Sequence, residues 1–315
     1  MMCIEGESFH AAMTKAKFAT KLVLVTGEGH GAGTSCFARD VPDLIKENAK
    51  MKTRQTFRWL ALAALILTIP ASSHAQGKDK KAPWRNLYEP HADDKMSYRL
   101  MKPLGFDSNQ SYPLIVSLHG GGGRGTDNKK QLKGWNRLLA EKQNRTDYPC
   151  YVLAPQADRL WDETHFKEIK KVIAALPSVD MNRIYILGHS MGGHGSYILI
   201  QIDPGYFAAA APSAGSGKRN TEPFITASVI KDLPIWAFHG NKDKVCPIER
   251  DQKLFAQMKE LGGNMKLTTW EGDGHAVSEK MITGSDNGTT QVSSKRCDPE
   301  PVFLKWLFAQ KRTAH

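Results

Sequence analysis

Residues 183–195 read Arg-Ile-Tyr-Ile-Leu-Gly-His-Ser-Met-Gly-Gly-His-Gly. The apolar run 184–187 is typical of a β-strand, and it leads directly into Gly188-His189-Ser190-Met191-Gly192, a G-x-S-x-G match. In such a turn a strand ends, the serine takes a strained backbone conformation, and a helix begins at once. Glycines two residues before and after the serine prevent side chains from colliding across the turn. The stretch therefore predicts a strand–turn–helix unit that lifts the Ser190 hydroxyl clear of a sheet.

A second glycine-rich stretch follows another apolar run. Residues 112–119 read Tyr-Pro-Leu-Ile-Val-Ser-Leu-His, as in a buried parallel strand, and four glycines follow at 120–123. Four consecutive glycines are entropically expensive to order, so they require a specific reason. We predict that the N–H groups of Gly121 and Gly122, with that of Met191, form an oxyanion hole. The alternative is a mobile loop without this role.

Two further side chains would complete a catalytic serine. A serine hydroxyl becomes reactive when a base removes its proton and a carboxylate orients that base. Asp243 lies in a tight loop after a late apolar strand, whereas Asp232 precedes that strand and Asp251 lies within a helical pattern. His275 lies in a glycine-flanked loop after the following strand. We therefore predict a catalytic triad of Ser190, Asp243 and His275.

Other aromatic and histidine side chains lie close to these motifs. His119 precedes the glycine run, His189 precedes the serine, and Trp161 follows a further strand, so all three are candidates to line a substrate cleft. His194 lies within the expected helix after the serine, and His239 precedes the acid loop. Neither is therefore expected to act as the base.

The chain after residue 95 alternates between strand-like and helix-like segments. This alternation predicts an α/β fold with a mostly parallel central sheet and helices on both faces. The expected strands are 96–102 (an edge strand), 112–119, 149–156, 182–187, 207–211, 233–239 and 265–270 (the last strand), and the expected helices are 131–143, 164–176, 191–202, 250–261 and 301–310.

The first 95 residues read differently. From residue 51 a basic segment, an 11-residue apolar run (59–69) and a small-residue site ending at Ala75 resemble a secretory signal peptide. A retained membrane anchor is the alternative, although spanning a bilayer takes about 20 residues. We expect 1–50 to be an overextended start with no fold, 51–75 a signal peptide, 76–95 a flexible leader and 96–315 the catalytic domain. The expected location is secreted or periplasmic.

Composition excludes several classes of function. Without residues 1–75 the chain has 34 Lys and Arg against 26 Asp and Glu, a net charge of +8, but no basic run interleaved with aromatic residues, so no nucleic-acid partner is expected. The glycine-rich segment 21–33 lacks the βαβ context of a dinucleotide site, so no cofactor is expected. Cys150, Cys246 and Cys297 form no C-x-x-C pair, so no metal site is expected. Cys246 and Cys297 are a candidate disulfide, and three free thiols are the alternative.

The chain resembles a known family. The stretches 118–128, 154–156, 188–195, 234–243 and 272–275 are similar to those of secreted α/β-hydrolases known as phospholipase/carboxylesterase-like enzymes or "predicted peptidases". These are relatives of polyhydroxybutyrate-depolymerase-like and feruloyl-esterase-like enzymes. The resemblance implies the α/β-hydrolase fold and the usual roles for Ser190, Asp243 and His275. The polar, glycine-rich insert 283–295 and Cys246 depart from the family pattern, which leaves substrate preference open.

The reaction expected from these residues is hydrolysis of carboxylic esters by a serine esterase through an acyl-enzyme, with a small or polymer-linked ester as substrate and no cofactor. A serine peptidase of the same fold is the first alternative. Such peptidases usually carry a large gating domain, for which the 240 residues after Ala75 leave no room. A binding module without catalysis is the second alternative, because fold alone does not determine function.

Overall fold

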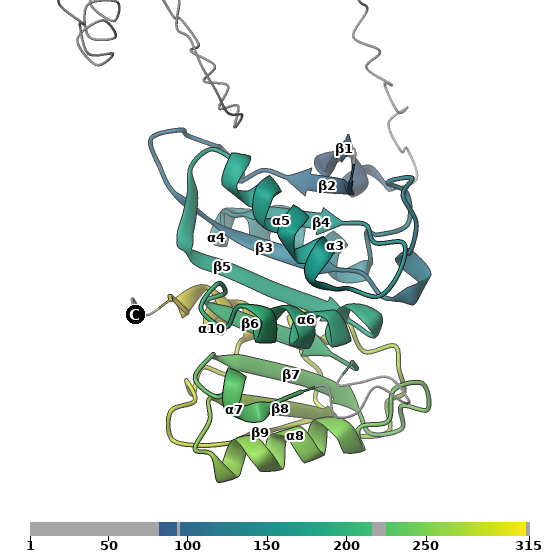
Figure 1. Cartoon of the computed structure of the whole chain (residues 1–315), viewed down its shortest axis with the longest axis vertical. Helices are drawn as coiled ribbons and strands as arrows, with labels where there is room; N and C mark the ends of the chain where they lie inside the picture. The colour runs from purple at the N-terminus through teal and green to yellow at the C-terminus, as the bar shows by residue number, and fades with distance from the viewer. Residues whose placement is uncertain (1–81, 93–94, 216–224, 313–315) are drawn as a thin grey trace, which may run out of the picture. The chain divides into compact units, whose positions relative to one another are not determined.

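One sheet of nine strands organises residues 82–92, 95–215 and 225–312, which are the residues that this computed structural model describes (Figure 1). The strand order is β1-β2-β4-β3-β5-β6-β7-β8-β9. The central strands are parallel, whereas β1, β2 and β9 run antiparallel to their neighbours. The strands are β1 (Glu89–Ala92), β2 (Ser97–Met101), β3 (Tyr112–Leu118), β4 (Tyr151–Pro155), β5 (Val179–His189), β6 (Ala209–Ser213), β7 (Ile235–Gly240), β8 (Met265–Trp270) and β9 (Gly288–Val292). The predicted mostly parallel sheet is confirmed.

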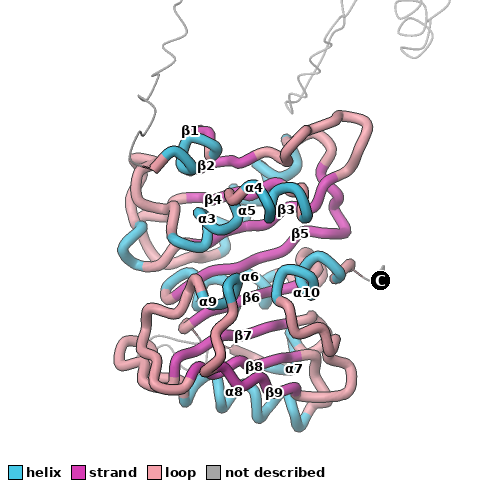
Figure 2. Tube along the Cα trace, turned by 180° about the vertical axis from the view of Figure 1, so that it is seen from behind, coloured by secondary structure: helices cyan, strands magenta, loops and turns pink. Residues whose placement is uncertain are grey.

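Helices cover both faces of this sheet, and each face has its own apolar core. Alternate residues of β3 show the division: Leu114 and Val116 belong to one core and Ile115 belongs to the other, as the period of two in a strand requires. The helices on the first face are α5 (Glu163–Ala175), α6 (Met191–Ile202), α7 (Ala227–Ile230) and α8 (Glu249–Glu260), and those on the second are α3 (Gly134–Leu139), α9 (Lys280–Thr283) and α10 (Phe303–Ala309) (Figures 1 and 2).

The prediction of a flexible leader over 76–95 is wrong for residues 83–92, which form regular structure. A 3-10 helix (Pro83–Leu87) is followed by β1, which pairs with β2, so β2 is not the edge strand that the sequence predicted. Tyr88 between them is fully buried and donates a hydrogen bond to the Asn136 carbonyl at 2.8 Å. The expected overextended start (1–50) and signal peptide (51–75) lie outside the described residues.

Two other segments differ from expectation. The single helix expected over 131–143 is instead α3 and α4 (Lys142–Asp147), because Glu141 between them adopts an extended conformation. The strand 265–270 is not the last, since β9 follows inside the insert 283–295 and pairs with β8. All five residues of β9 are exposed, so no alternation of apolar side chains marked it as a strand.

The candidate disulfide between Cys246 and Cys297 is absent, because Cys150, Cys246 and Cys297 are all free thiols. The Cys297 thiol contacts the carbonyl of Met265, the first residue of β8, whereas Cys246 follows the opposite end of the parallel strand β7. The two cysteines therefore lie at opposite ends of neighbouring strands, separated by the length of β8, roughly 17 Å, which is far beyond the reach of a disulfide.

Among the described helices, none has the length and apolar character needed to cross a bilayer.

Candidate active site

Ser190 lies at a sharp turn between β5 and α6. Its φ of 58° and ψ of −118° are strained for a residue with a side chain, as the motif predicted. A Cβ on Gly192 would overlap the Leu118 carbonyl oxygen at the end of β3, and one on Gly188 would overlap the backbone of Gly192. The turn therefore requires glycine at both positions, and it places Ser190 at the carboxyl edge of the sheet.

The glycine run lies against this serine. A Cβ built on Gly120 would lie 3.3 Å from the Ser190 Cβ and 3.9 Å from its Oγ. Gly121–Gly123 form a short 3-10 turn, and the first N–H groups of such a turn have no partner within it. The same holds for Met191, the first residue of α6. The loop and the helix start thus meet beside Ser190, and the oxyanion role of Gly121, Gly122 and Met191 stays a prediction.

The acid and the base meet as predicted. His275 Nδ1 lies 2.7 Å from Asp243 Oδ2, and Asp243 Oδ1 accepts hydrogen bonds from the N–H groups of Val245 and Cys246 at 2.8 and 2.9 Å. Burial would raise the pKa of Asp243, but the hydrogen bonds from His275, Cys246 and Val245 outweigh it and hold this pKa below its ordinary value. The carboxylate is therefore ionised, and it orients His275 so that Nε2 is left for proton transfer.

The ring of His275 lies close to His189, the residue before the serine. The ring of His189, the residue before Ser190, lies 4.8 Å from the ring of His275, and its Nδ1 lies 3.1 Å from the Ser213 hydroxyl. Burial, and then the neighbouring His275, lower the pKa of His189 to about 3. His189 is therefore a neutral, half-buried neighbour of His275, and its place in a substrate cleft stays a prediction.

His119 and Trp161 do not line a cleft, contrary to expectation. His119 is fully buried; its Nε2 accepts from the Ala157 N–H at 3.0 Å, so Nδ1 carries the proton and donates to the Gly120 carbonyl at 2.8 Å. Burial lowers the pKa of His119 to about 4, which keeps the ring neutral. Trp161 is 2% exposed and donates to the His119 carbonyl at 3.2 Å. Both side chains are therefore buried and hydrogen-bond to the backbone at the start of the glycine loop.

The structure also reveals a contact that the sequence motifs did not predict. His239, near the end of β7, lies with its Nε2 3.3 Å from Asp243 Oδ2 and its Nδ1 2.6 Å from Asp251 Oδ2. Asp251 lies in the first turn of α8, as its helical pattern indicated. The only hint of this contact in the sequence was that His239 lies four residues before Asp243.

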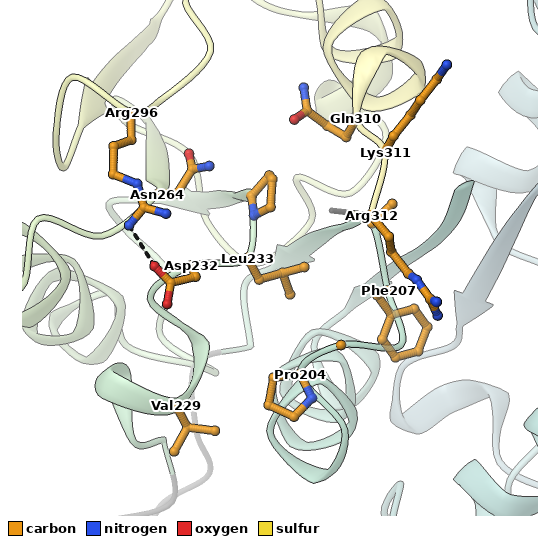
Figure 3. A pocket seen from close by; sticks show the side chains of 13 residues that line it. Pro204, Phe207, Val229, Asp232, Leu233, Asn264, Arg296, Gln310, Lys311 and Arg312 are labelled. Atoms are coloured by element: carbon orange, nitrogen blue, oxygen red, sulfur yellow. Dashed lines mark hydrogen bonds and ion pairs between the residues drawn. The ribbon is translucent and has the colours of Figure 1, made fainter. Parts of the chain in front are cut away.

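A separate cavity lies at the opposite ends of the strands. It has a volume of about 540 Å³ and is lined by residues that precede β6, β7 and β8 and by the segment after α10 (Figure 3). Asp232, which the sequence pattern disfavoured as the catalytic acid, lines this cavity, and its carboxylate lies 2.7 Å from the Arg296 guanidinium. Ser190, Asp243 and His275 do not line this cavity. The candidate active site is therefore not this cavity but the carboxyl edge of the sheet, where these three residues lie.

Comparison with known proteins agrees with this geometry. The family model of the dienelactone hydrolases ("Dienelactone hydrolase family") matches residues 140–296, which include the serine turn, the acid loop and His275. The chain has the α/β-hydrolase fold. The serine at the strand–helix turn and the pair of Asp243 and His275 lie at the same edge of this sheet.

Proteins similar to this chain carry both esterase and peptidase names. A thermostable esterase of known structure is 34% identical, with a TM-score of 0.56 over 72% of this chain and 63% of that one. "Uncharacterized peptidase YuxL" of Bacillus subtilis (strain 168) is 24% identical over 57% of this chain and 33% of its own length. The acylaminoacyl peptidase of Pyrococcus horikoshii is 18% identical, with a TM-score of 0.49 over 61% of this chain and 38% of that one. The chain thus spans about a third of the curated relative.

Proposed function

We propose that the protein is a serine hydrolase that cleaves carboxylic esters, with Ser190 as nucleophile, His275 as general base and acid, and Asp243 as the orienting carboxylate. The observation that carries the proposal is the 2.7 Å contact of His275 with Asp243, at the edge where β5 turns at Ser190. The 34% identity to a thermostable esterase supports ester hydrolysis in particular.

The proposed reaction has two halves. His275 Nε2 removes the hydroxyl proton as Ser190 Oγ attacks the ester carbonyl, and the N–H groups of Met191, Gly121 and Gly122 stabilise the oxyanion. The C–O bond to the alcohol then breaks, and His275 returns the proton to the departing alcohol. Water, deprotonated by His275, attacks the acyl-enzyme, and collapse of the second intermediate releases the carboxylic acid and restores Ser190.

Similarity to a peptidase keeps amide hydrolysis as the second candidate. The two are separated by assaying p-nitrophenyl butyrate and an N-acetylated peptide p-nitroanilide with the wild-type chain and with Ser190→Ala as the blank. We expect Ser190-dependent hydrolysis of the ester and no Ser190-dependent release from the anilide. Peptide cleavage with kcat/KM above about 10⁴ M⁻¹s⁻¹, the lower end of the usual enzyme range, would assign the chain to the peptidases instead.

We also propose that the protein is exported and is cleaved after Ala75. The support is the sequence of 51–75, with its basic start, apolar run and small-residue end. N-terminal sequencing of the protein recovered outside the cytoplasm tests this point, with Gln76 expected as the first residue. A secreted form that retains residues 1–50 would contradict it.

A further inference from the structure

His239 is a buried histidine next to the triad that the proposed reaction does not use. It belongs to β7, its side chain is 0% exposed, and both of its ring nitrogens have close partners. Nδ1 lies 2.6 Å from Asp251 Oδ2, and Nε2 lies 2.7 Å from the Cys246 carbonyl and 3.3 Å from Asp243 Oδ2. These partners come from α8 and from the acid loop, so His239 connects the two.

The partners determine which protons the ring carries. A carbonyl oxygen only accepts, so the contact with Cys246 requires a proton on Nε2. Nδ1 faces Asp251, whose side chain is 1% exposed and whose Oδ1 already accepts from the Tyr197 hydroxyl at 3.0 Å. A carboxylate in the first turn of a helix is stabilised as an anion, which favours a proton on Nδ1 as well. These contacts favour an imidazolium on His239, paired with the Asp251 carboxylate.

The surrounding groups agree with this charge. Burial acts to lower the pKa of His239, but the hydrogen bond and the charge of Asp251, the Cys246 carbonyl and the charge of Asp243 together raise it. On the side of the triad, the titratable neighbours include the neutral His189 and the base His275. Two carboxylates and one imidazolium thus form a buried group next to His275.

We propose that His239 is a positioning residue that holds the acid loop in place and, as a cation, limits the basicity of His275. This inference rests on the proposed function of the triad. The first role follows from Cys246, whose carbonyl accepts from His239 while its N–H donates to Asp243 Oδ1. The second follows from distance, since Asp243 Oδ2 contacts both histidines, at 2.7 Å to His275 Nδ1 and 3.3 Å to His239 Nε2. A cation at that distance offsets part of the negative charge that would otherwise stabilise protonated His275.

Asp251→Asn is the main test, because it removes the charge and keeps the shape. The amide can donate to Nδ1 of a neutral His239, whose Nε2 proton still bonds to the Cys246 carbonyl. The variant removes the Asp251 anion together with the His239 cation, and the cation is the nearer of the two to Asp243, so the net change should make His275 easier to protonate. We expect the acid limb of the kcat/KM profile for p-nitrophenyl butyrate to move up by about half a pH unit, with a smaller change at the alkaline plateau. His239→Gln should move the limb the same way, but it leaves Asp251 without a counter-charge and so should also lower Tm.

Asp180→Asn is the matched control. Asp180 accepts from Arg183 at 2.6 Å near the start of β5, at the other edge of the sheet, so its removal also breaks an ion pair but should leave the acid limb in place. A folded Asp251→Asn variant whose acid limb coincides with that of the wild type would overturn the charge role.

A measurement on the wild-type chain is independent of catalysis and of how well the variants fold. Long-range ¹H–¹⁵N spectra of the histidine rings should show an imidazolium, protonated on both nitrogens, that persists without titration from pH 5 to pH 8. Its absence would overturn the proposal even if ester hydrolysis is confirmed. If it is present but Ser190 is unreactive, the proposed function fails while the charged state of His239 stands.

Discussion

Replacement of Ser190 by alanine is expected to lower kcat/KM for p-nitrophenyl butyrate by about 10⁴- to 10⁶-fold, because no other group can form the acyl-enzyme. The remaining rate would come from binding and from the oxyanion donors alone. Alanine meets the same backbone strain as serine at φ 58°, so the fold should be retained. The measurement is initial rates of both proteins at equal concentration, with circular dichroism as the control for folding. Equal rates would show that the hydrolysis arises elsewhere.

Replacement of Asp243 by asparagine is expected to lower kcat by about 10⁴-fold, the loss seen when a triad aspartate is replaced by its amide. The geometry explains why the loss should be this large. The Oδ1 position accepts two backbone N–H groups, from Val245 and Cys246, so the amide oxygen must take that place and the NH₂ must face His275. Nδ1 of His275 then has to accept, which moves its proton to Nε2 and removes the base.

Asp232→Asn is a suitable control for this variant. It also removes a carboxylate close to β7, but at the opposite edge of the sheet, where Asp232 pairs with Arg296 on the surface. Its kcat should equal that of the wild type. If Asp243→Asn retained a tenth or more of the activity, another acid would have to orient His275.

The parts of the fold that the sequence predicted are those where burial dictates residue type. Strand segments buried on both faces, such as β3 and residues 184–187 of β5, are continuous apolar runs, and the turn at Ser190 demands glycine at 188 and 192 because backbone atoms occupy the space of a side chain. The missed strands, β1 and β9, are at the two edges of the sheet, where mostly exposed positions accept polar residues and no alternation is required. Both strands are defined by their pairing with a neighbouring strand, β2 or β8, and a local sequence pattern does not encode that pairing.

The site shows the same division. Ser190, Asp243 and His275 follow the carboxyl ends of three parallel strands, β5, β7 and β8, so it could be predicted that Asp243 and His275 meet at the edge where Ser190 lies. Whether a histidine lines a cleft or supports a loop depends on contacts across the fold. His119 was expected in the cleft, yet it is enclosed by the backbone of Gly120 and Ala157. His239 was set aside, although it contacts Asp243 directly and also contacts Asp251 on α8.

Covalent labelling with a fluorophosphonate, followed by peptide mass spectrometry, tests the central claim most directly, because only an activated serine reacts quickly with this probe. We expect one adduct per chain, on Ser190. Prior incubation with p-nitrophenyl butyrate should slow its formation, and both Ser190→Ala and His275→Ala should prevent it. A folded wild-type chain that stays unlabelled, or that carries the adduct on a different residue, would contradict the account.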